Sequence, residues 1–177
     1  MSASQGGFVR SVRAQEVDEL YAMVRELAEY ERSLDQVRST AEDFRVALFG
    51  PEPRLFGHVV EHDGVLGGFA VWYVNFSTWS GQHGIYLEDL YVRPHLRGRG
   101  YGKELLRTLA RICVERGYAR LEWWVLDWNS PAVAFYRSIG ALSMDDWTVN
   151  RLTDAALVRM AQVSQDALGP GPERDGG

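Results

Sequence analysis

The sequence predicts an α/β or α+β domain in which a mixed β-sheet carries helices on both faces. Segments with strand-like alternation of apolar and polar residues are interspersed with segments whose apolar residues recur at helical spacing. Strand pairs that resemble hairpins occur near both ends of this pattern. The 177 residues are 46% hydrophobic and 24% charged, which is ordinary for a folded chain, so one domain with a buried core is expected.

The first fifty residues predict one strand and two helices. Alternation over 8–12 indicates the strand, and apolar residues at helical spacing indicate a helix over about 16–32. A second helix is expected over 40–49, because Thr40 and Asp43 have the spacing of a capping box, in which the two residues satisfy free N–H groups at the helix start.

A β-hairpin is predicted next. Residues 55–62 and 65–76 are strand-like, and Asp63-Gly64 between them is a strong turn pair, because both central positions of such a turn need positive φ. The segment 77–84 is expected to be a loop, and 85–92 the strand that follows it.

The second half of the chain also predicts alternating helices and strands. The expected elements are a helix over 100–116, a strand over 120–126, a helix from Asn129 to Gly140, a strand pair over 141–144 and 148–152, and a short helix over 154–161. Residues 1–7 are expected to form a disordered lead and residues 162–177 a flexible tail, which leaves a domain over 8–161.

Composition disfavours several kinds of site and location. Cys113 is the only cysteine and the four histidines show no paired metal spacing, so we expect no internal disulfide and no metal site. The net charge of −5 disfavours non-specific nucleic-acid binding. The sequence has no apolar run long enough to span a membrane and no signal-peptide pattern, so a cytoplasmic protein without membrane contact is expected.

The stretch RGRGYGK, from Arg97 to Lys103, lies between a predicted strand and a predicted helix. Glycine lets the backbone approach a ligand closely, and the free N–H groups of a helix's first turn favour a phosphate. Two common phosphate-loop motifs fail here. GxGxxG would place its last glycine at Lys103, and GxxxxGK[ST] would need Gly at Arg97 and Ser or Thr at Glu104. The stretch therefore predicts a pyrophosphate cradle, but disfavours an ordinary nucleotide-binding protein.

Two segments carry a family resemblance. The pattern Arg-x-x-Gly-x-Gly over 97–102, after a strand ending in Val-Arg-Pro, resembles motif A of the GCN5-related N-acetyltransferases, which bind acetyl-coenzyme A (acetyl-CoA). NSPAVAFY over 129–136, followed by Gly140, resembles the family's second cofactor element. The resemblance implies a twisted, mostly antiparallel mixed sheet and acetyl-CoA as co-substrate. The cofactor-binding residues that it implies are Leu90, Tyr91, Val92, Arg97, Gly98, Arg99, Gly100, Tyr101, Gly102, Lys103, Asn129, Ser130, Pro131 and Ala132.

Acetyl transfer to an amine needs a proton acceptor, a donor to an oxyanion and an acid for the departing thiolate. An amine such as that of lysine has a pKa of about 10.4, so neutralising it at pH 7 costs about 4–5 kcal/mol. Glu88 is the candidate acceptor: it lies four residues before Val92, so both face one side of a regular strand, and a backbone N–H near Val92 could hold the oxyanion. Asp89 then faces the other side and is interpreted as structural.

Tyr136 is the candidate acid. By composition alone, a Phe-Tyr pair in a helix favours core packing. In the family that the chain resembles, however, the tyrosine at this position protonates the coenzyme A sulfur, and the asparagine at the position of Asn129 contacts the pantetheine arm. The predicted catalytic residues are therefore Tyr136 and Glu88.

The resemblance extends to the diamine acetyltransferase group, whose members act on spermidine, spermine or thialysine. It rests on 26–31, 86–92 and 125–129 and covers roughly 8–161. Ser77-Thr78 before Trp79 and a short loop around 145–147 depart from the group in regions that touch the acceptor. The resemblance implies a homodimer. It also implies an amine site made of Tyr30, Glu31, Glu88, Glu122, Trp123 and Trp124.

The sequence thus predicts an enzyme that transfers an acetyl group from acetyl-CoA to a primary amine of a small cationic molecule by direct attack. The acceptor would be a polyamine, a diamine or a thialysine-like amino acid. Two alternatives stay open. One is acetylation of a protein N-terminus or lysine, which needs an open groove for a peptide. The other is a non-catalytic acyl-CoA-binding module. The presence of both candidate catalytic residues, Tyr136 and Glu88, disfavours it.

Overall fold

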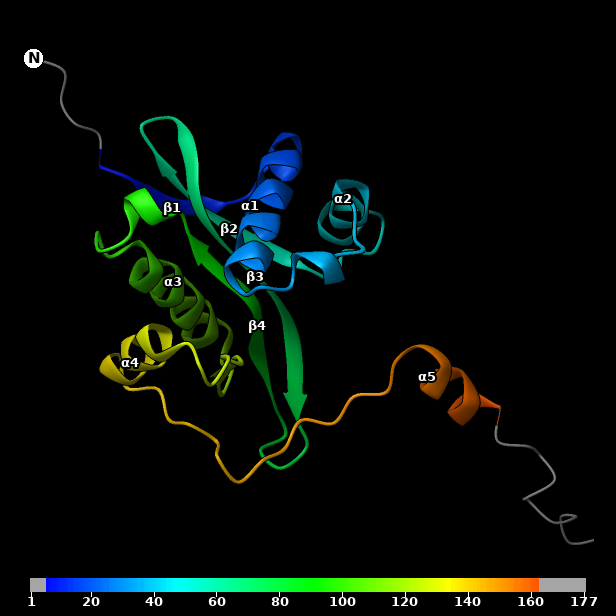
Figure 1. Ribbon diagram of the computed structural model, residues 1–177. Coiled ribbons are helices and arrows are strands. Elements are labelled where there is room, and N and C mark those ends of the chain that lie inside the picture. Colours follow the sequence, from blue (N-terminus) through cyan, green and yellow to red (C-terminus); the bar gives the residue numbers. More distant parts are fainter. Residues whose placement is uncertain (1–5, 163–177) are drawn as a thin grey trace, which may run out of the picture. The chain divides into compact units, whose positions relative to one another are not determined.

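The computed structural model describes residues 6–162, and the chain divides between Ile139 and Gly140 into two units that are described separately. The first unit is built on a five-stranded sheet in the order β1-β2-β3-β4-β5 (Figure 1). The strands are β1 (Phe8–Ser11), β2 (Phe56–His62), β3 (Val65–Ser77), β4 (Gln82–Val92) and β5 (Leu121–Glu122). The first four pair antiparallel and β5 runs parallel to β4, which confirms the predicted mixed, mostly antiparallel sheet.

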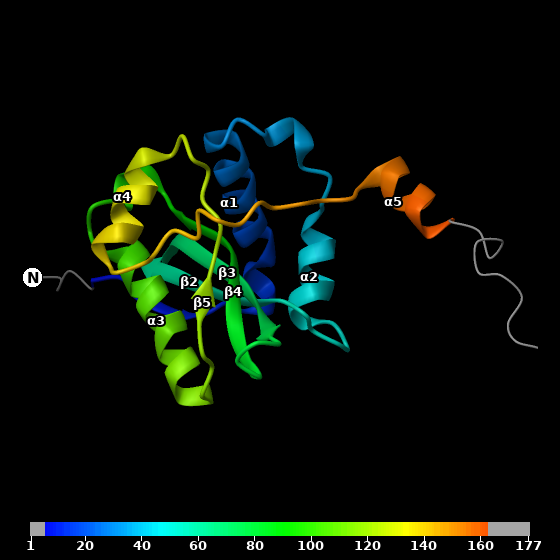
Figure 2. The ribbon, with the colours of Figure 1, turned by 90° about the horizontal axis from the view of Figure 1, so that it is seen from below.

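Helices cover both faces of this sheet, as predicted. Figures 1 and 2 show α1 and α2 on one face, and α3 and α4 on the other. The helices of the first unit are α1 (Val17–Tyr30), α2 (Ala41–Phe49), α3 (Tyr101–Arg116) and α4 (Ser130–Ser138), with short 3₁₀ turns at Ala14–Glu16, Leu34–Gln36 and Pro94–Leu96. Among residues 6–162, no helix is long and apolar enough to cross a membrane.

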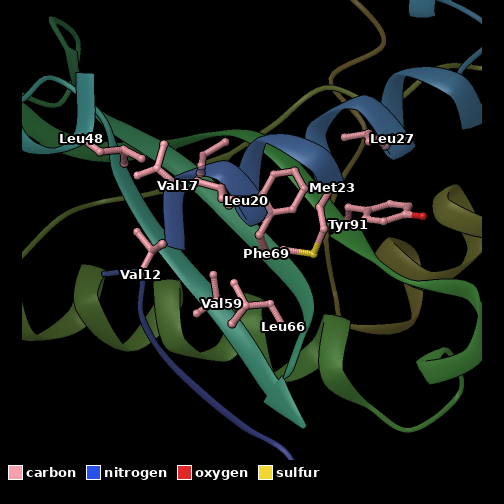
Figure 3. Packing of buried hydrophobic residues seen from close by; sticks show 11 residues of the cluster. Val12, Val17, Leu20, Met23, Leu27, Leu48, Val59, Leu66, Phe69 and Tyr91 are labelled. Carbon is pink, nitrogen blue, oxygen red and sulfur yellow. The ribbon is translucent and has the colours of Figure 1, made fainter. Parts of the chain in front are cut away.

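Two hydrophobic clusters hold the layers together. In the first, Leu20 and Met23 of α1 lie beside Phe69 of β3 (Figure 3). The second lies between the other face and α3, and includes Trp72 of β3 and Leu105 of α3. Burying one such aliphatic or aromatic side chain contributes about 1.5–3 kcal/mol. Packing therefore fixes α1 and α3 against the sheet, and both helices carry parts of the site described below.

Local sequence sets the element ends. The Thr40 side chain accepts a hydrogen bond from the Asp43 N–H and the Asp43 carboxylate accepts one from the Thr40 N–H, which confirms the capping box. Asp63 (φ 51°) and Gly64 (φ 80°) form the β2–β3 turn in the left-handed region, as the Asp-Gly pair predicts. Gly117 (φ 66°) ends α3 in the same conformation.

Strand β4 has one residue more than the part of β3 opposite it. Val71 pairs with Asp89, whereas the next residue, Trp72, pairs with Leu87, so Glu88 is the extra residue of a β-bulge. The bulge shifts the alternation of faces, because Leu87 packs in the second cluster whereas Asp89, two residues later, lies opposite Val71 of the first. The argument that four-residue spacing puts Glu88 and Val92 on one face is therefore wrong.

Three strand predictions also differ from the structure. Strand β5 has two residues instead of the predicted 120–126, because its pairing with β4 ends at Tyr86, just before the bulge bends β4 away. The predicted strands over 141–144 and 148–152 are wrong: both segments lack regular structure, since neither pairs with any strand among residues 6–162.

The second unit contains one helix, α5 (Asp154–Ala161), within its described part, and this confirms the short helix predicted over 154–161. Residues 1–5 and 163–177 lie outside the described residues, so the disordered lead and the flexible tail stay predictions.

Candidate active site

A pocket of about 660 Å³ lies beside the part of β4 that is no longer paired with β5. Strand β5 pairs with β4 only at Ile85 and Tyr86, and no other described strand lies beside β4 on that side. The backbone of the following residues on this edge is thus free to bond a ligand. The pocket is lined by the end of α1, by Glu88–Val92 of β4, by the glycine-rich cradle, by Trp124–Leu126 and by α4.

The cradle at the start of α3 fits an anion. Gly98 (φ 75°) and Gly100 (φ 85°) take the left-handed conformation, and a Cβ on either glycine would meet no atom within 4 Å, so the space above them is open. Gly100 is the N-cap of α3, and the first main-chain bond of the helix runs from the Glu104 N–H to the Gly100 carbonyl. The N–H groups of Tyr101, Gly102 and Lys103 therefore remain available for a phosphate.

Arg97 joins the cradle to the rest of the pocket. Its Nε donates to the Val92 carbonyl at 2.9 Å, and its guanidinium lies 5.0 Å from the ring centroid of Tyr30 and 5.6 Å from that of Tyr91. The Tyr101 hydroxyl accepts from the Gly7 N–H at 3.0 Å and is 2.7 Å from His62 Nδ1 on β2. These contacts hold the cradle against the sheet from two sides.

The other end of the pocket is acidic. Glu31 at the C-terminal end of α1 lines it together with Glu88 and Asp89 of β4. Burial raises the pKa of Glu31, and burial together with the charges of Glu88 and Glu31 raises the pKa of Asp89 to about 7. None of these three carboxyl groups has a hydrogen-bond or ion-pair partner within residues 6–162, so no described protein group neutralises this end of the pocket by direct contact.

Tyr136 of α4 lies in the same pocket. Its ring packs against Trp123 with centroids 5.0 Å apart, and burial together with the charge of Glu31 raises the pKa of the phenol to about 12. The hydroxyl therefore keeps its proton at every physiological pH and can donate it, or donate a hydrogen bond, to an atom in the pocket.

Asn129 links α4 to α1. Its Oδ1 accepts from the Ala132 N–H at 3.4 Å, which caps α4, and from the Tyr30 hydroxyl at 3.2 Å. Since Oδ1 is occupied, the Asn129 amide nitrogen is the side-chain group left to donate to a ligand.

Most predicted site residues line this pocket, but four do not. Arg99, Ser130, Glu122 and Trp123 are not among the lining residues. Glu122 accepts from the Asn75 amide at 2.9 Å and pairs with Arg120 at 2.9 Å, so it is occupied within the sheet. Trp123 contributes indirectly, because it packs against Tyr136.

Sequence reasoning missed Asp89 and several apolar lining residues. Asp89 lies on the face opposite Val92, as predicted, but it was interpreted as structural because a bulge that brings this face to the pocket leaves no mark in the alternation of LEDLYV. Leu27, Leu96 and Phe135 recur at ordinary core spacing, so nothing in the sequence separates them from packing residues. Within residues 6–162, no group of three or more His, Cys, Asp or Glu side chains is placed to hold a metal ion.

Arg93 clamps α1 to the end of β4. It donates to Glu26 through Nε (3.1 Å) and Nη2 (2.7 Å), pairs with Glu19 at 2.7 Å, and donates to the Leu66 carbonyl at 2.8 Å. The hydrogen bonds from Arg93 lower the pKa of Glu26. Because Tyr30 and Glu31 follow on the same helix end, this clamp fixes the acidic end of the pocket relative to the cradle.

An anion cradle, an open strand edge and a buried phenol beside three carboxyl groups are the parts of an enzyme that transfers a group from a phosphate-bearing carrier to an amine. The comparisons with known proteins define the family. The acetyltransferase (GNAT) family model matches residues 17–141, and the chain belongs to this family of enzymes.

Relatives and solved structures agree with this assignment. Thialysine N-epsilon-acetyltransferase of Sus scrofa is 32% identical over 164 residues, covering 86% of this chain and 96% of the relative. Spermidine/spermine N(1)-acetyltransferase-like protein 1 of Homo sapiens is 29% identical over 163 residues, covering 86% of this chain and 23% of the relative. An integron cassette protein from V. cholerae superposes with a TM-score of 0.75 at 23% identity, covering 89% and 99% of the two chains, and supports the fold.

We expect Arg93→Met to lower the free energy of unfolding by about 1–3 kcal/mol at pH 7, because it leaves Glu26, Glu19 and the Leu66 carbonyl without their donor. The folded pKa of Glu26 is lowered, so its stabilisation is present above the unfolded pKa and is lost as pH falls through the folded pKa. The deficit should therefore shrink in urea unfolding at pH 3. Arg54→Met is the control, because Arg54 and Glu52 are 84% and 81% exposed. Equal losses in the two variants would contradict the clamp.

Proposed function

We propose that the protein transfers an acetyl group from acetyl-CoA to a primary amine of a small cationic molecule by direct attack. The observation that carries this proposal is the pocket itself, where three carboxyl groups with no partner among the described residues lie together with Tyr136 and the anion cradle. No covalent enzyme intermediate is needed, because amine and thioester can be held side by side.

The residues present fit the co-substrate. The N–H groups of the cradle and the side chains of Arg97 and Lys103 would hold its phosphates, and the open edge of β4 with the Asn129 amide would hold its pantetheine arm. When bound there, acetyl-CoA supplies the thioester carbonyl that the amine attacks. The free β4 backbone beside Val92 supplies an N–H toward that carbonyl oxygen.

The acid role of Tyr136 has a limit set by its pKa. A thiol such as that of cysteine has a pKa of about 8.5, so full proton transfer from a phenol with a pKa of about 12 is uphill by about 5 kcal/mol. Tyr136 therefore acts first as a hydrogen-bond donor to the sulfur and completes the transfer only when it regains a proton from the acylated nitrogen.

The acceptor is a polyamine, a diamine or a thialysine-like amino acid. One of the relatives described above is named as an acetyltransferase of thialysine, and the other is named as a protein like spermidine/spermine acetyltransferase. The basic side chains that line the pocket are Arg97 and Lys103, and both belong to the cradle. A substrate's own carboxylate must therefore point away from the acidic end, and the ammonium group enters it.

Turnover of one small amine is the first expected result. Thiol release from acetyl-CoA is measured with spermidine, putrescine, lysine, thialysine and a basic peptide. Tyr136→Phe should lower kcat by about 100-fold or more, because the proton donor is lost. Tyr118→Phe, which lies outside the pocket, is the matched control and should keep full activity. Turnover of the peptide alone would replace the proposal with protein acetylation, and binding without turnover would favour an acyl-CoA-binding module.

We expect Gly100→Ala to weaken coenzyme A binding by about 5–10-fold, which corresponds to about 1 kcal/mol, because the added Cβ would project into the open space above the cradle that a phosphate would occupy. Gly64→Ala is a matched control, because Gly64 (φ 80°) has the same conformation and open surroundings as Gly100 (φ 85°) but lies in the β2–β3 turn. Both variants should lose similar stability, and only Gly100→Ala should change the calorimetric Kd. If both variants bind coenzyme A equally well, the cradle is not part of the cofactor site.

A homodimer is also proposed. Its support is the family resemblance together with exposed apolar side chains on the second unit, which a partner could cover. These side chains are Leu142, Met144, Trp147, Val149, Leu152, Leu157, Val158 and Met160. Light scattering at micromolar concentration should give twice the mass of one chain, and the mass of a single chain would contradict the dimer.

A further inference from the structure

The bulge in β4 puts Asp89 on the face opposite Leu87, although a regular strand would place these two residues on one face. Asp89 lies opposite Val71 in the ladder, and Val71 packs in the cluster under α1, so Asp89 lies on the α1 face of the sheet. It lines the pocket between Glu88 on its own strand and Leu90. One residue of extra chain thus brings two consecutive carboxylates of β4 to the same cavity.

The groups around Asp89 come from three elements. The charges of Glu88 on β4 and of Glu31 from α1 raise the pKa of Asp89. Tyr136 from α4 lines the same pocket, and the charge of Glu31 raises its pKa too. Arg97 lines the same pocket, but its guanidinium is held by the Val92 carbonyl and the rings of Tyr30 and Tyr91. Asp89 itself has no hydrogen-bond or ion-pair partner within residues 6–162. A half-buried carboxyl group without a protein partner is expensive, so a ligand is its natural partner.

We propose that Asp89 is the carboxylate that takes the proton from the substrate's ammonium group, the role predicted from sequence for Glu88, while Glu88 and Glu31 attract the ammonium group and tune Asp89. This rests on the proposed function. One N–H bond of R–NH₃⁺ breaks and its electron pair stays on nitrogen. The Asp89 carboxylate binds the proton, which leaves R–NH₂ ready to attack and a neutral carboxylic acid that returns the proton to solvent after product release.

Burial makes Asp89 the better acceptor of the two carboxylates on β4. Glu88 is exposed to solvent, whereas the pKa of Asp89 is raised from 3.8 to about 7. That shift brings the acceptor about three units closer to an amine of pKa about 10.4, which favours the proton transfer by about a thousand-fold. The acceptor must still be ionised to act, so the rate should fall as pH falls below about 7.

The test compares Asp89→Asn with Glu88→Gln in pH profiles of kcat/KM. In the wild type, kcat/KM should fall about tenfold per pH unit below pH 7, and this fall is the acidic limb of the profile. Asp89→Asn should lower kcat at pH 8 by 100-fold or more and should lack this acidic limb. Glu88→Gln should retain the limb but shift it to lower pH, because a negative neighbour of Asp89 is gone. If Glu88→Gln removes the limb and Asp89→Asn keeps it, the assignment is overturned.

Two further measurements separate this inference from the proposed function. Carbon-13 NMR of the free wild-type protein, with Asp89→Asn to assign the signal, should show the Asp89 carboxyl titrating near pH 7. Titration below pH 5 overturns the inference even if the enzyme is active. The melting temperature of Asp89→Asn at pH 8 should also exceed that of the wild type by about 2–4 °C or more. Unfolding would then not explain the loss of activity in this variant. No turnover of any amine by the wild type would overturn the proposed function, and the role of Asp89 with it.

Discussion

At Glu88, strand β4 carries one residue more than β3 opposite it, and most of the site depends on this bulge. The bulge bends β4 beyond Tyr86, where its pairing with β5 ends, and so opens an edge of unpaired backbone within the sheet. It also shifts the alternation of faces, so that Leu87 packs on the α3 side while Asp89, two residues later, lies on the α1 side and lines the pocket.

Charge is separated along the pocket. Arg97, Lys103 and the first turn of α3 make the cradle end positive, while Glu31, Glu88 and Asp89 make the other end negative. Two ligands of opposite charge can therefore bind side by side without competing for one end. The clamp of Arg93 on Glu26 and Glu19 fixes the distance between the ends, because α1 carries the acidic side and the cradle follows Arg93 directly in the chain.

The features that could be predicted from sequence are those set by residues close together in the chain. The turn at Asp63-Gly64, the capping box at Thr40 and the helix that begins after Asn129 each follow from a few neighbouring side chains, and the structure confirms them. The bulge depends instead on which residues of β3 lie opposite β4. The sequence LEDLYV over 87–92 is compatible with a regular strand and with a bulged one. The strands predicted over 141–144 and 148–152 failed for a related reason, since apolar alternation does not supply a neighbouring strand.

The acidic end is also a source of instability. A rise in the pKa of Asp89 from 3.8 to about 7 corresponds to about 4 kcal/mol that the ionised group costs the folded state above pH 7. Between pH 4 and 7 the folded chain binds this proton more tightly than the unfolded chain does, so stability from this group falls as pH rises. A bound ammonium group would offset that cost by supplying the missing counter-charge. The carboxylate of Asp89, which has no partner within residues 6–162, therefore weakens the empty protein and would at the same time supply the counter-charge for the cationic substrate that we propose. A substitution that removed this charge would stabilise the fold and should weaken binding of such a substrate.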